Sequence, residues 1–167
     1  GNPLAKSNVT FNINGIHYTR VSDDEGNAYL NINLDVGQYV ITATNDKGLS
    51  VSNVINISKC NSTISGSNAH IIYGVDRDYT VTLMGLNNKS VRSATVYFSY
   101  AGRNVTALTN ENGEATITIS NISIGTYSIE YGFLGDINYY PCKSNSTFVV
   151  ANSTVILSAE DLDMVYK

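Results

Sequence analysis

Near its start the chain reads Val9-Thr10-Phe11-Asn12-Ile13-Asn14-Gly15, and the same pattern returns as Val96-Tyr97-Phe98-Ser99-Tyr100-Ala101-Gly102. In both stretches apolar side chains occupy alternate positions, which is the pattern of a strand with one buried face. The offset is 87 residues, from Val9 to Val96. This offset is the size of a small domain and exceeds the period of about 20 to 50 residues that is typical of solenoid repeats.

Further stretches repeat in the same order. The turn and strand at 24–32 return at 111–119, and Gly37-Gln38-Tyr39-Val40-Ile41 returns one residue further on as Gly125-Thr126-Tyr127-Ser128-Ile129. β-branched and aromatic residues dominate the alternating segments, as they do in sheets. The sequence therefore predicts an all-β protein built of tandem immunoglobulin-like antiparallel β-sandwiches.

The second copy of the pattern contains seven expected strands, near residues 63–73, 79–86, 94–101, 103–109, 114–120, 126–132 and 146–151. The first copy has counterparts for the last five, among them a strand at 28–34. We therefore expect residues 1–59 to form a partial immunoglobulin-like sandwich that lacks its first two strands. Residues 60–152 are expected to form a complete one.

The C-terminal residues 153–167 resemble the beginning of the second unit. Ser153-Thr154-Val155-Ile156 and Met164-Val165-Tyr166-Lys167 correspond to Ser62-Thr63-Ile64 and Ile71-Ile72-Tyr73-Gly74. They are expected to be the first strand of a following repeat. An incomplete sandwich has open edges, so we also expect these residues, from the same or a neighbouring chain, to complete the first unit by strand-swapped association.

Two tyrosines occupy equivalent positions where the penultimate strand of each unit begins. Tyr39 and Tyr127 each stand two residues after a glycine. In immunoglobulin-like sandwiches a tyrosine at this place often bonds to backbone a few residues upstream, in a tyrosine corner. The alternative is an ordinary core tyrosine after a tight turn.

The composition excludes several functions. Charged residues make up 14% of the chain, the net charge is −4, and there are 21 asparagines, so the polar surface is mostly uncharged. Without a basic patch, nucleic-acid binding is not expected. No apolar run approaches the ~18 residues of a membrane helix. The histidines and cysteines lack metal-ligand spacing, no catalytic residues can be assigned, and no cofactor is expected.

The repeated segments resemble those of large archaeal adhesin-like surface proteins of methanogens, which carry many bacterial-Ig-like domains in tandem. The resemblance rests on segments 1–5, 9–20, 24–28, 34–39 and 131–140. It implies an extracellular, wall-associated location and a role in adhesion or display. The implied partners are neighbouring repeats and a surface glycan or protein of another cell.

In an extracellular location the two cysteines are candidates for a disulfide bond. Cys60 and Cys142 flank the first and last strands of the second unit, at the same end of an immunoglobulin-like sandwich. A disulfide would close a loop of about 80 residues and contribute up to roughly 4 to 5 kcal/mol of stability. Two free thiols are the alternative.

The same location makes the asparagines candidates for glycosylation. Eight of them stand in Asn-x-Ser/Thr sequons, which are Asn8, Asn56, Asn61, Asn88, Asn104, Asn121, Asn145 and Asn152. In a chain this rich in Asn, Ser and Thr, several sequons arise by chance. We interpret the set as suggestive of a surface glycoprotein.

Two other interpretations remain open beside a stalk or display segment. Tyr97, Tyr139 and Tyr140 are candidates for a sugar-stacking platform, in a carbohydrate- or protein-binding module whose ligand site lies on the strand-end loops. An accessory domain of a secreted glycosidase is also compatible with the fold. The acidic clusters at 23–25, 76–78 and 161–163 lack the EF-hand pattern and are expected to be solvated turn residues.

Overall fold

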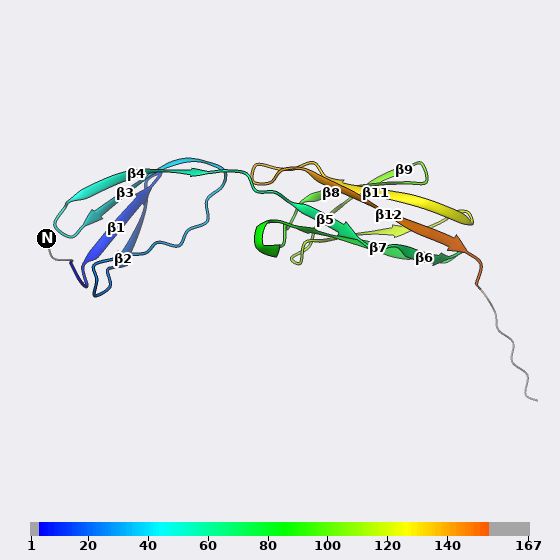
Figure 1. Cartoon of the computed structure of the whole chain (residues 1–167), viewed down its shortest axis with the longest axis horizontal. Coiled ribbons are helices and arrows are strands. Elements are labelled where there is room, and N and C mark those ends of the chain that lie inside the picture. The colour runs from blue at the N-terminus through cyan, green and yellow to red at the C-terminus, as the bar shows by residue number, and fades with distance from the viewer. Residues whose placement is uncertain (1–3, 154–167) are drawn as a thin grey trace, which may run out of the picture. The chain divides into compact units, whose positions relative to one another are not determined.

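The computed structural model describes residues 4–153 and divides the chain into two compact units (Figure 1). Unit 1 comprises Gly1–Cys60 with Gly135–Tyr140, and unit 2 comprises Asn61–Leu134 with Pro141–Lys167. Among the described residues the regular structure is β-strand, apart from the 3-10 turn η1 (Leu86–Asn88), so the predicted all-β class is confirmed. The predicted strand at 153–167 lies outside the described residues except for Ser153.

Unit 2 is a sandwich of two sheets, as predicted. One sheet has the strand order β10-β7-β5 and the other β6-β12-β11-β8-β9. The strands are β5 (Thr63–Gly66), β6 (Ala69–Ile72), β7 (Arg77–Met84), β8 (Thr95–Tyr100), β9 (Arg103–Leu108), β10 (Glu114–Ile119), β11 (Gly125–Phe133) and β12 (Cys142–Ala151). Alternate side chains of both sheets meet in a closed core, where Leu83, Val96 and Phe148 are each 0% exposed.

The expected first strand of unit 2, at 63–73, is two strands in different sheets. β5 pairs antiparallel with β7, whereas β6 pairs parallel with β12. Between them Asn68 accepts a hydrogen bond from the Thr147 N–H through Oδ1, at 2.9 Å. The chain therefore crosses from one sheet to the other at residues 67–68.

Unit 1 is a single four-stranded sheet. Its strands are β1 (Asn8–Ile13), β2 (Ile16–Val21), β3 (Gly37–Asn45) and β4 (Ser50–Ile57), in the order β2-β1-β3-β4. This order matches β9-β8-β11-β12 in unit 2. Unit 1 thus contains one sheet of the sandwich, and its described residues provide no strand of the opposite sheet.

The predicted strand at 28–34 is therefore wrong. These residues run from β2 to β3 as irregular chain (Figure 1), with apolar residues half-buried and polar ones exposed in alternation. Their counterpart in unit 2, β10, pairs only with β7. The described residues of unit 1 contain no counterpart of β7, so 28–34 have the side-chain pattern of a strand but no described neighbour to bond with.

The first hairpin of each unit is built alike. Asn14 and Gly15 have φ values of 51° and 82°, and Ala101 and Gly102 have values of 45° and 75°. Two successive residues with positive φ define a type I′ turn, whose twist matches that of the paired strands. These hairpins hold β1 against β2 and β8 against β9.

Candidate functional site

The inward side of the unit 1 sheet is the main candidate surface. We call it the open face, and it is formed by Val9, Phe11, Ile41, Ala43, Val51 and Ile55 on β1, β3 and β4. The counterparts of Val9 and Phe11 in unit 2, Val96 and Phe98, are 0% and 1% exposed. Ile13 is the one fully buried apolar residue in the described part of residues 1–60. A surface that is core in unit 2 is therefore accessible in unit 1.

A hollow of about 300 Å³ lies at one end of the open face. Its walls are Val9, Ala43, Asn45, Leu49, Ser50 and Val51. Leu49 is 69% exposed and Val51 is 59% exposed, which is high for large apolar side chains. Grouped exposed apolar residues mark interaction sites more often than scattered ones do.

The outer side of the same sheet is mostly polar and internally bonded, although Val40 and Val54 form one exposed apolar pair on it. Hydroxyls of Thr42 and Ser52 lie 2.8 Å apart across β3 and β4, and Gln38 Nε2 donates to Asn56 Oδ1 at 3.0 Å. Such cross-strand pairs suit a solvated sheet face. The two sides of the sheet thus differ, and the inner side is the more continuously apolar one.

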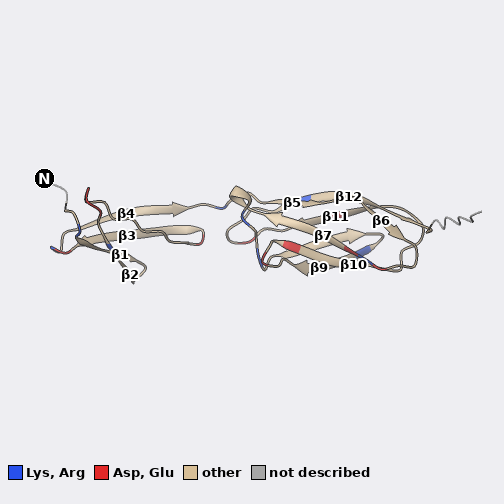
Figure 2. Ribbon diagram, turned by 90° about the horizontal axis from the view of Figure 1, so that it is seen from below, with Lys and Arg blue, Asp and Glu red and all other residues tan. Residues whose placement is uncertain are grey.

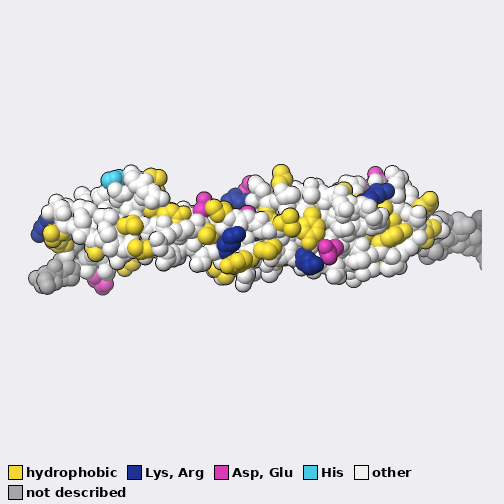
Figure 3. All heavy atoms as spheres, turned by 90° about the horizontal axis from the view of Figure 1, so that it is seen from above, with side chains coloured by type: hydrophobic (Ala, Val, Ile, Leu, Met, Phe, Trp, Pro, Cys, Tyr) yellow, Lys and Arg dark blue, Asp and Glu magenta, His cyan; other side chains and the backbone are white. Residues whose placement is uncertain are grey.

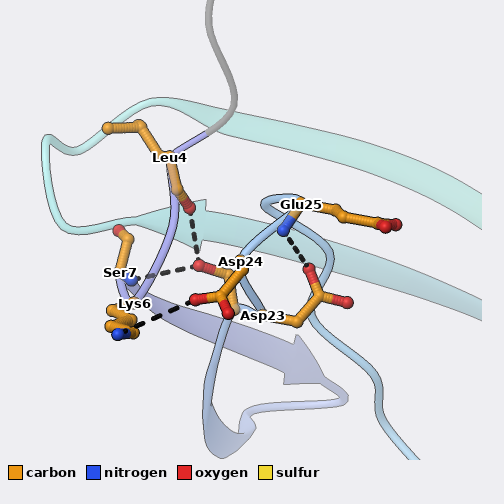
Figure 4. Close-up of polar contacts among 7 residues, drawn as sticks. Leu4, Lys6, Ser7, Asp23, Asp24 and Glu25 are labelled. Carbon is orange, nitrogen blue, oxygen red and sulfur yellow. Dashed lines mark hydrogen bonds and ion pairs between the residues drawn. The ribbon is translucent and has the colours of Figure 1, made fainter.

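Both units contain the same buried hydroxyl bridge, which the sequence interpretation missed. In unit 1, Ser22 Oγ accepts from the Ser7 N–H at 3.0 Å and donates to the Leu4 carbonyl at 2.6 Å (Figure 4). In unit 2, Thr109 Oγ1 bridges the Ala94 N–H and the Val91 carbonyl at 2.9 and 2.7 Å.

The hydroxyl bridge ties the chain before the first hairpin to the end of that hairpin. Ser22 and Thr109 are 4% and 5% exposed. The Thr109 hydroxyl satisfies two buried backbone groups, and the Ser22 hydroxyl satisfies the buried Ser7 N–H and the part-buried Leu4 carbonyl. The two positions are 87 residues apart, the same offset as Val9 and Val96. The sequence signal for this bridge is a hydroxyl residue at equivalent positions of the two units, Ser22 and Thr109.

Tyr39 and Tyr127 make equivalent bonds. The hydroxyl of Tyr39 donates to the Asp35 carbonyl at 2.9 Å, and that of Tyr127 donates to the Ser123 carbonyl at 3.0 Å. Each bond spans four residues and closes the loop that leads into β3 or β11. This is the bond pattern by which a tyrosine corner is defined.

The acidic residues of the 23–25 cluster serve a turn, as expected, whereas Asp78 of the 76–78 cluster lies on β7 and accepts a hydrogen bond from Thr118 Oγ1 at 2.7 Å. Asp23 Oδ1 accepts from the N–H groups of Glu25 and Asn27, and Asp24 lies 3.8 Å from the ammonium of Lys6 (Figure 4). Charged side chains are sparse along the strands (Figure 2). Within residues 4–153 no group of three or more His, Cys, Asp or Glu side chains is arranged to hold a metal ion.

The three candidate stacking tyrosines do not belong to one unit. Tyr97 is on β8 of unit 2, while Tyr139 and Tyr140 are in the 135–140 segment of unit 1. Tyr97 lies against its cross-strand partner Gly132, where an added Cβ would come within 2.5 Å of the phenol oxygen. Tyr97 therefore covers a glycine in its own sheet, and neither unit by itself holds the three rings of the platform.

The two cysteines are half-buried, and the sequons lie at the surface. Cys60 and Cys142 are free thiols in the structure, and the disulfide between them stays a prediction. The asparagines of all eight sequons are exposed, which leaves each accessible to a glycan. The face in Figure 3 is mostly polar and uncharged, with scattered apolar side chains.

Comparison with known proteins adds little beyond this geometry. No family model matches the chain, and no curated protein matches it. Within the described residues no helix has the length and apolar character needed to cross a membrane. The immunoglobulin-like assignment thus rests on the strand order and closed core of unit 2.

Several solved structures are similar to the chain at low identity. Fibronectin(III)-like modules of Clostridium thermocellum CbhA match with a TM-score of 0.42 and 15% identity, covering 95% of this chain and 85% of theirs. Domains 4 and 5 of the S-layer protein SbsC match with a TM-score of 0.41 and 13% identity, covering 88% of this chain and 72% of theirs. The D00-D0 domain of Intimin matches with a TM-score of 0.40 and 17% identity, covering 85% of this chain and 78% of its own. Similarity at this level carries no argument about function and gives no support for a methanogen origin.

Proposed function

We propose that this chain is a non-enzymatic structural and adhesive module of an extracellular, wall-associated protein, with immunoglobulin-like units that form a stalk or display segment. The observation that carries the proposal is the repetition of one architecture within one chain. The same sheet order, hydroxyl bridge and loop-closing tyrosine recur in both units. Such repetition extends a protein in space without adding a reactive group.

The strand arrangement of unit 2 is suited to resist a pulling force applied at its two ends. β6 runs parallel to β12, with Ala69 opposite Phe148 and Ile72 opposite Ala151. The chain enters this unit before β5 and leaves it after β12, so tension on Asn61 and Asn152 pulls β6 and β12 in opposite directions along their length. A parallel ladder under that load breaks in shear, several hydrogen bonds at a time, instead of peeling one by one.

Single-molecule pulling of the whole chain tests the mechanical part of the proposal. The Tyr73 N–H donates to the Ala151 carbonyl at 2.8 Å, and the Tyr73 side chain is 56% exposed. Tyr73→Pro removes that donor, so unit 2 should unfold at a lower force. The matched control, Tyr73→Ala, keeps the N–H and should unfold at the wild-type force. Equal forces for all three proteins would contradict the stalk function.

Location and ligand are tested separately. On intact cells of the source organism, antibodies against unit 2 should label the surface, and external protease should remove the label. The proposed partners are neighbouring repeats and a glycan or protein of another cell. Specific binding on a glycan array that is lost in Tyr140→Ala would favour a carbohydrate-binding module over a stalk.

A further inference from the structure

We infer that the open face and the free edge of β4 receive residues 153–167 of a second copy of this chain. The first observation is the edge itself. Among the described strands β4 pairs with β3 alone, whereas its counterpart β12 pairs with both β11 and β6. No described strand therefore lies beside β4 in the position that β6 has beside β12.

β4 lacks the features that protect an edge strand. Its sequence, Ser50-Val51-Ser52-Asn53-Val54-Ile55-Asn56-Ile57, contains no charge, proline or glycine. Natural edge strands are commonly guarded by charged residues, proline or bulges because unpaired backbone groups recruit other strands. The opposite edge strand, β2, carries His17 and Arg20. One edge of unit 1 is thus protected and the other is suited to strand addition.

The chain itself contains the segment that fits this edge. Residues 153–156 and 164–167 correspond to residues 62–64 and 71–74, which include parts of β5 and β6. In unit 2, β6 pairs with the last residues of β12, Val150 opposite Ile71 and Ala151 opposite Ile72. Since Gly37 pairs with Ile57 as Gly125 pairs with Val150, the same register places Met164 opposite Ile57 and Val165 opposite Ser58.

The open face offers a place for the other half of the segment. In unit 2, β5 lies against the inner side of β11 and β12, where the Gly66 carbonyl accepts hydrogen bonds from Ser146 and Tyr131 at 3.2 and 3.4 Å. Ile64 on β5 is 7% exposed, whereas the preceding Thr63 is exposed. Val155 corresponds to Ile64, so it is the residue that would enter the apolar side of unit 1.

Donation between copies combines backbone pairing along β4 with burial of apolar surface, as in other strand additions. Reciprocal exchange closes a dimer, and one-way exchange builds a chain of copies. Residues 153–167 correspond to β5 and β6 but contain no counterpart of β7, so residues 28–34 remain unpaired in the complex.

Sedimentation of the full chain tests the association. Wild-type protein should form dimers or larger species whose fraction rises with concentration, and removal of 154–167 should leave monomers. Val155→Asp places a charge at the inward position and should also give monomers. The control Thr154→Asp alters the outward position and should associate like the wild type. A wild-type chain that stays monomeric at all concentrations overturns the inference.

Cross-linking tests the register. In a Cys60→Ser, Cys142→Ser background, one copy carries Ser58→Cys and the other carries Val165→Cys. After mixing, a disulfide should join the two chains, and replacing the second substitution with Asp161→Cys should reduce its yield at least tenfold. Equal yields for positions 161 and 165, or a link only when both substitutions are in one chain, overturn donation from a second copy in this register.

Discussion

In each unit a single hydroxyl group stabilises the attachment of the first hairpin to the chain that precedes it. Thr109 Oγ1 contacts two backbone groups of residues that are themselves buried, since Val91 and Ala94 are 4% and 7% exposed. A valine at position 109 has nearly the same shape but can neither accept nor donate. The bridge therefore stabilises through satisfaction of buried polar groups and not through packing.

Thr109→Val should lower the free energy of unfolding of unit 2 by about 1 to 3 kcal/mol, because a buried N–H and a buried carbonyl lose their partner. Urea denaturation followed by tyrosine fluorescence measures the change. Thr126→Val, an exposed position on β11, is the control and should stay within about 0.5 kcal/mol of the wild type. Similar values for the two variants would mean that the bridge contributes nothing.

Two neighbouring tyrosines should respond in opposite ways to loss of the hydroxyl. The ring centres of Tyr79 and Tyr131 lie 6.2 Å apart. The Tyr131 hydroxyl bonds to Ser146 Oγ at 2.9 Å, whereas the Tyr79 hydroxyl has no hydrogen-bond partner among the described residues. Tyr131→Phe should lower the free energy of unfolding by about 1 kcal/mol, and Tyr79→Phe should leave it unchanged or raise it. Destabilisation of equal size in both would contradict this.

Tyr79 also predicts a dependence on pH. Burial raises the pKa of the Tyr79 phenol above its ordinary value of 10.0, so the folded state holds that proton more tightly than the unfolded state. The resulting stability is fully present below pH 10 and is lost as the pH rises through the raised folded value. The free energy of unfolding of the wild type relative to Tyr79→Phe should therefore stay constant from pH 8 to about pH 9 and fall as the pH rises through 10, in parallel denaturant titrations. A constant difference would argue against burial of the neutral phenol.

At the level of elements, the presence of a partner decides whether a pattern becomes a strand. Residues 28–34 alternate as β10 does, with Leu30 and Ile32 in the places of Ile117 and Ile119. β10 has a full ladder to β7, and 28–34 have none. The alternation predicts correctly which side chains face inward, but it does not show whether a neighbouring strand exists, so the strand predicted at 28–34 does not form.

Hydrogen exchange distinguishes the two segments. Backbone amides of 28–34 should exchange near the unprotected rate, whereas those of β10 that bond to β7 should exchange more slowly by roughly a thousandfold or more. Mass spectrometry of peptides covering both segments in one sample provides the internal control. Comparable protection in both segments would show that 28–34 are paired in solution.

At the level of the whole molecule, the two units differ in how much of their apolar surface is buried. Phe98 is 1% exposed, whereas its counterpart Phe11 is half-buried on the open face. Because hydrophobic stabilisation follows the apolar area removed from water, unit 2 should be the more stable unit. At concentrations where the chain is monomeric, calorimetry should show unit 1 unfolding at a lower temperature than unit 2.

A matched pair of substitutions assigns the two transitions. Phe98→Ala should lower the free energy of unfolding of unit 2 by about 3 to 5 kcal/mol through loss of a core side chain. Phe11→Ala should affect only the lower transition and by less, because a side chain that is already partly exposed has less apolar contact to lose. A single transition that both substitutions shift equally would contradict independent units.

The local sequence pattern was enough to predict most of the strands and the side of the sheet on which their apolar residues lie. Alternation placed the apolar sides, as at Val9 and Phe11, the glycines marked the hairpins, and the 87-residue offset revealed the duplication. These are local properties, set by side-chain direction along a strand. They also located Tyr39 and Tyr127 at the loops that their hydroxyls close.

Which of these segments pair with a neighbouring strand depends on the tertiary structure. Pairing joins residues far apart in the chain, so it depends on which other strands are present. For that reason β5 and β6 separate into different sheets, 28–34 stay unpaired, and the apolar side of β1, β3 and β4 lies open. The same alternating pattern yields a closed core in unit 2 and an accessible surface in unit 1, because the described residues form a second sheet in unit 2 and none in unit 1.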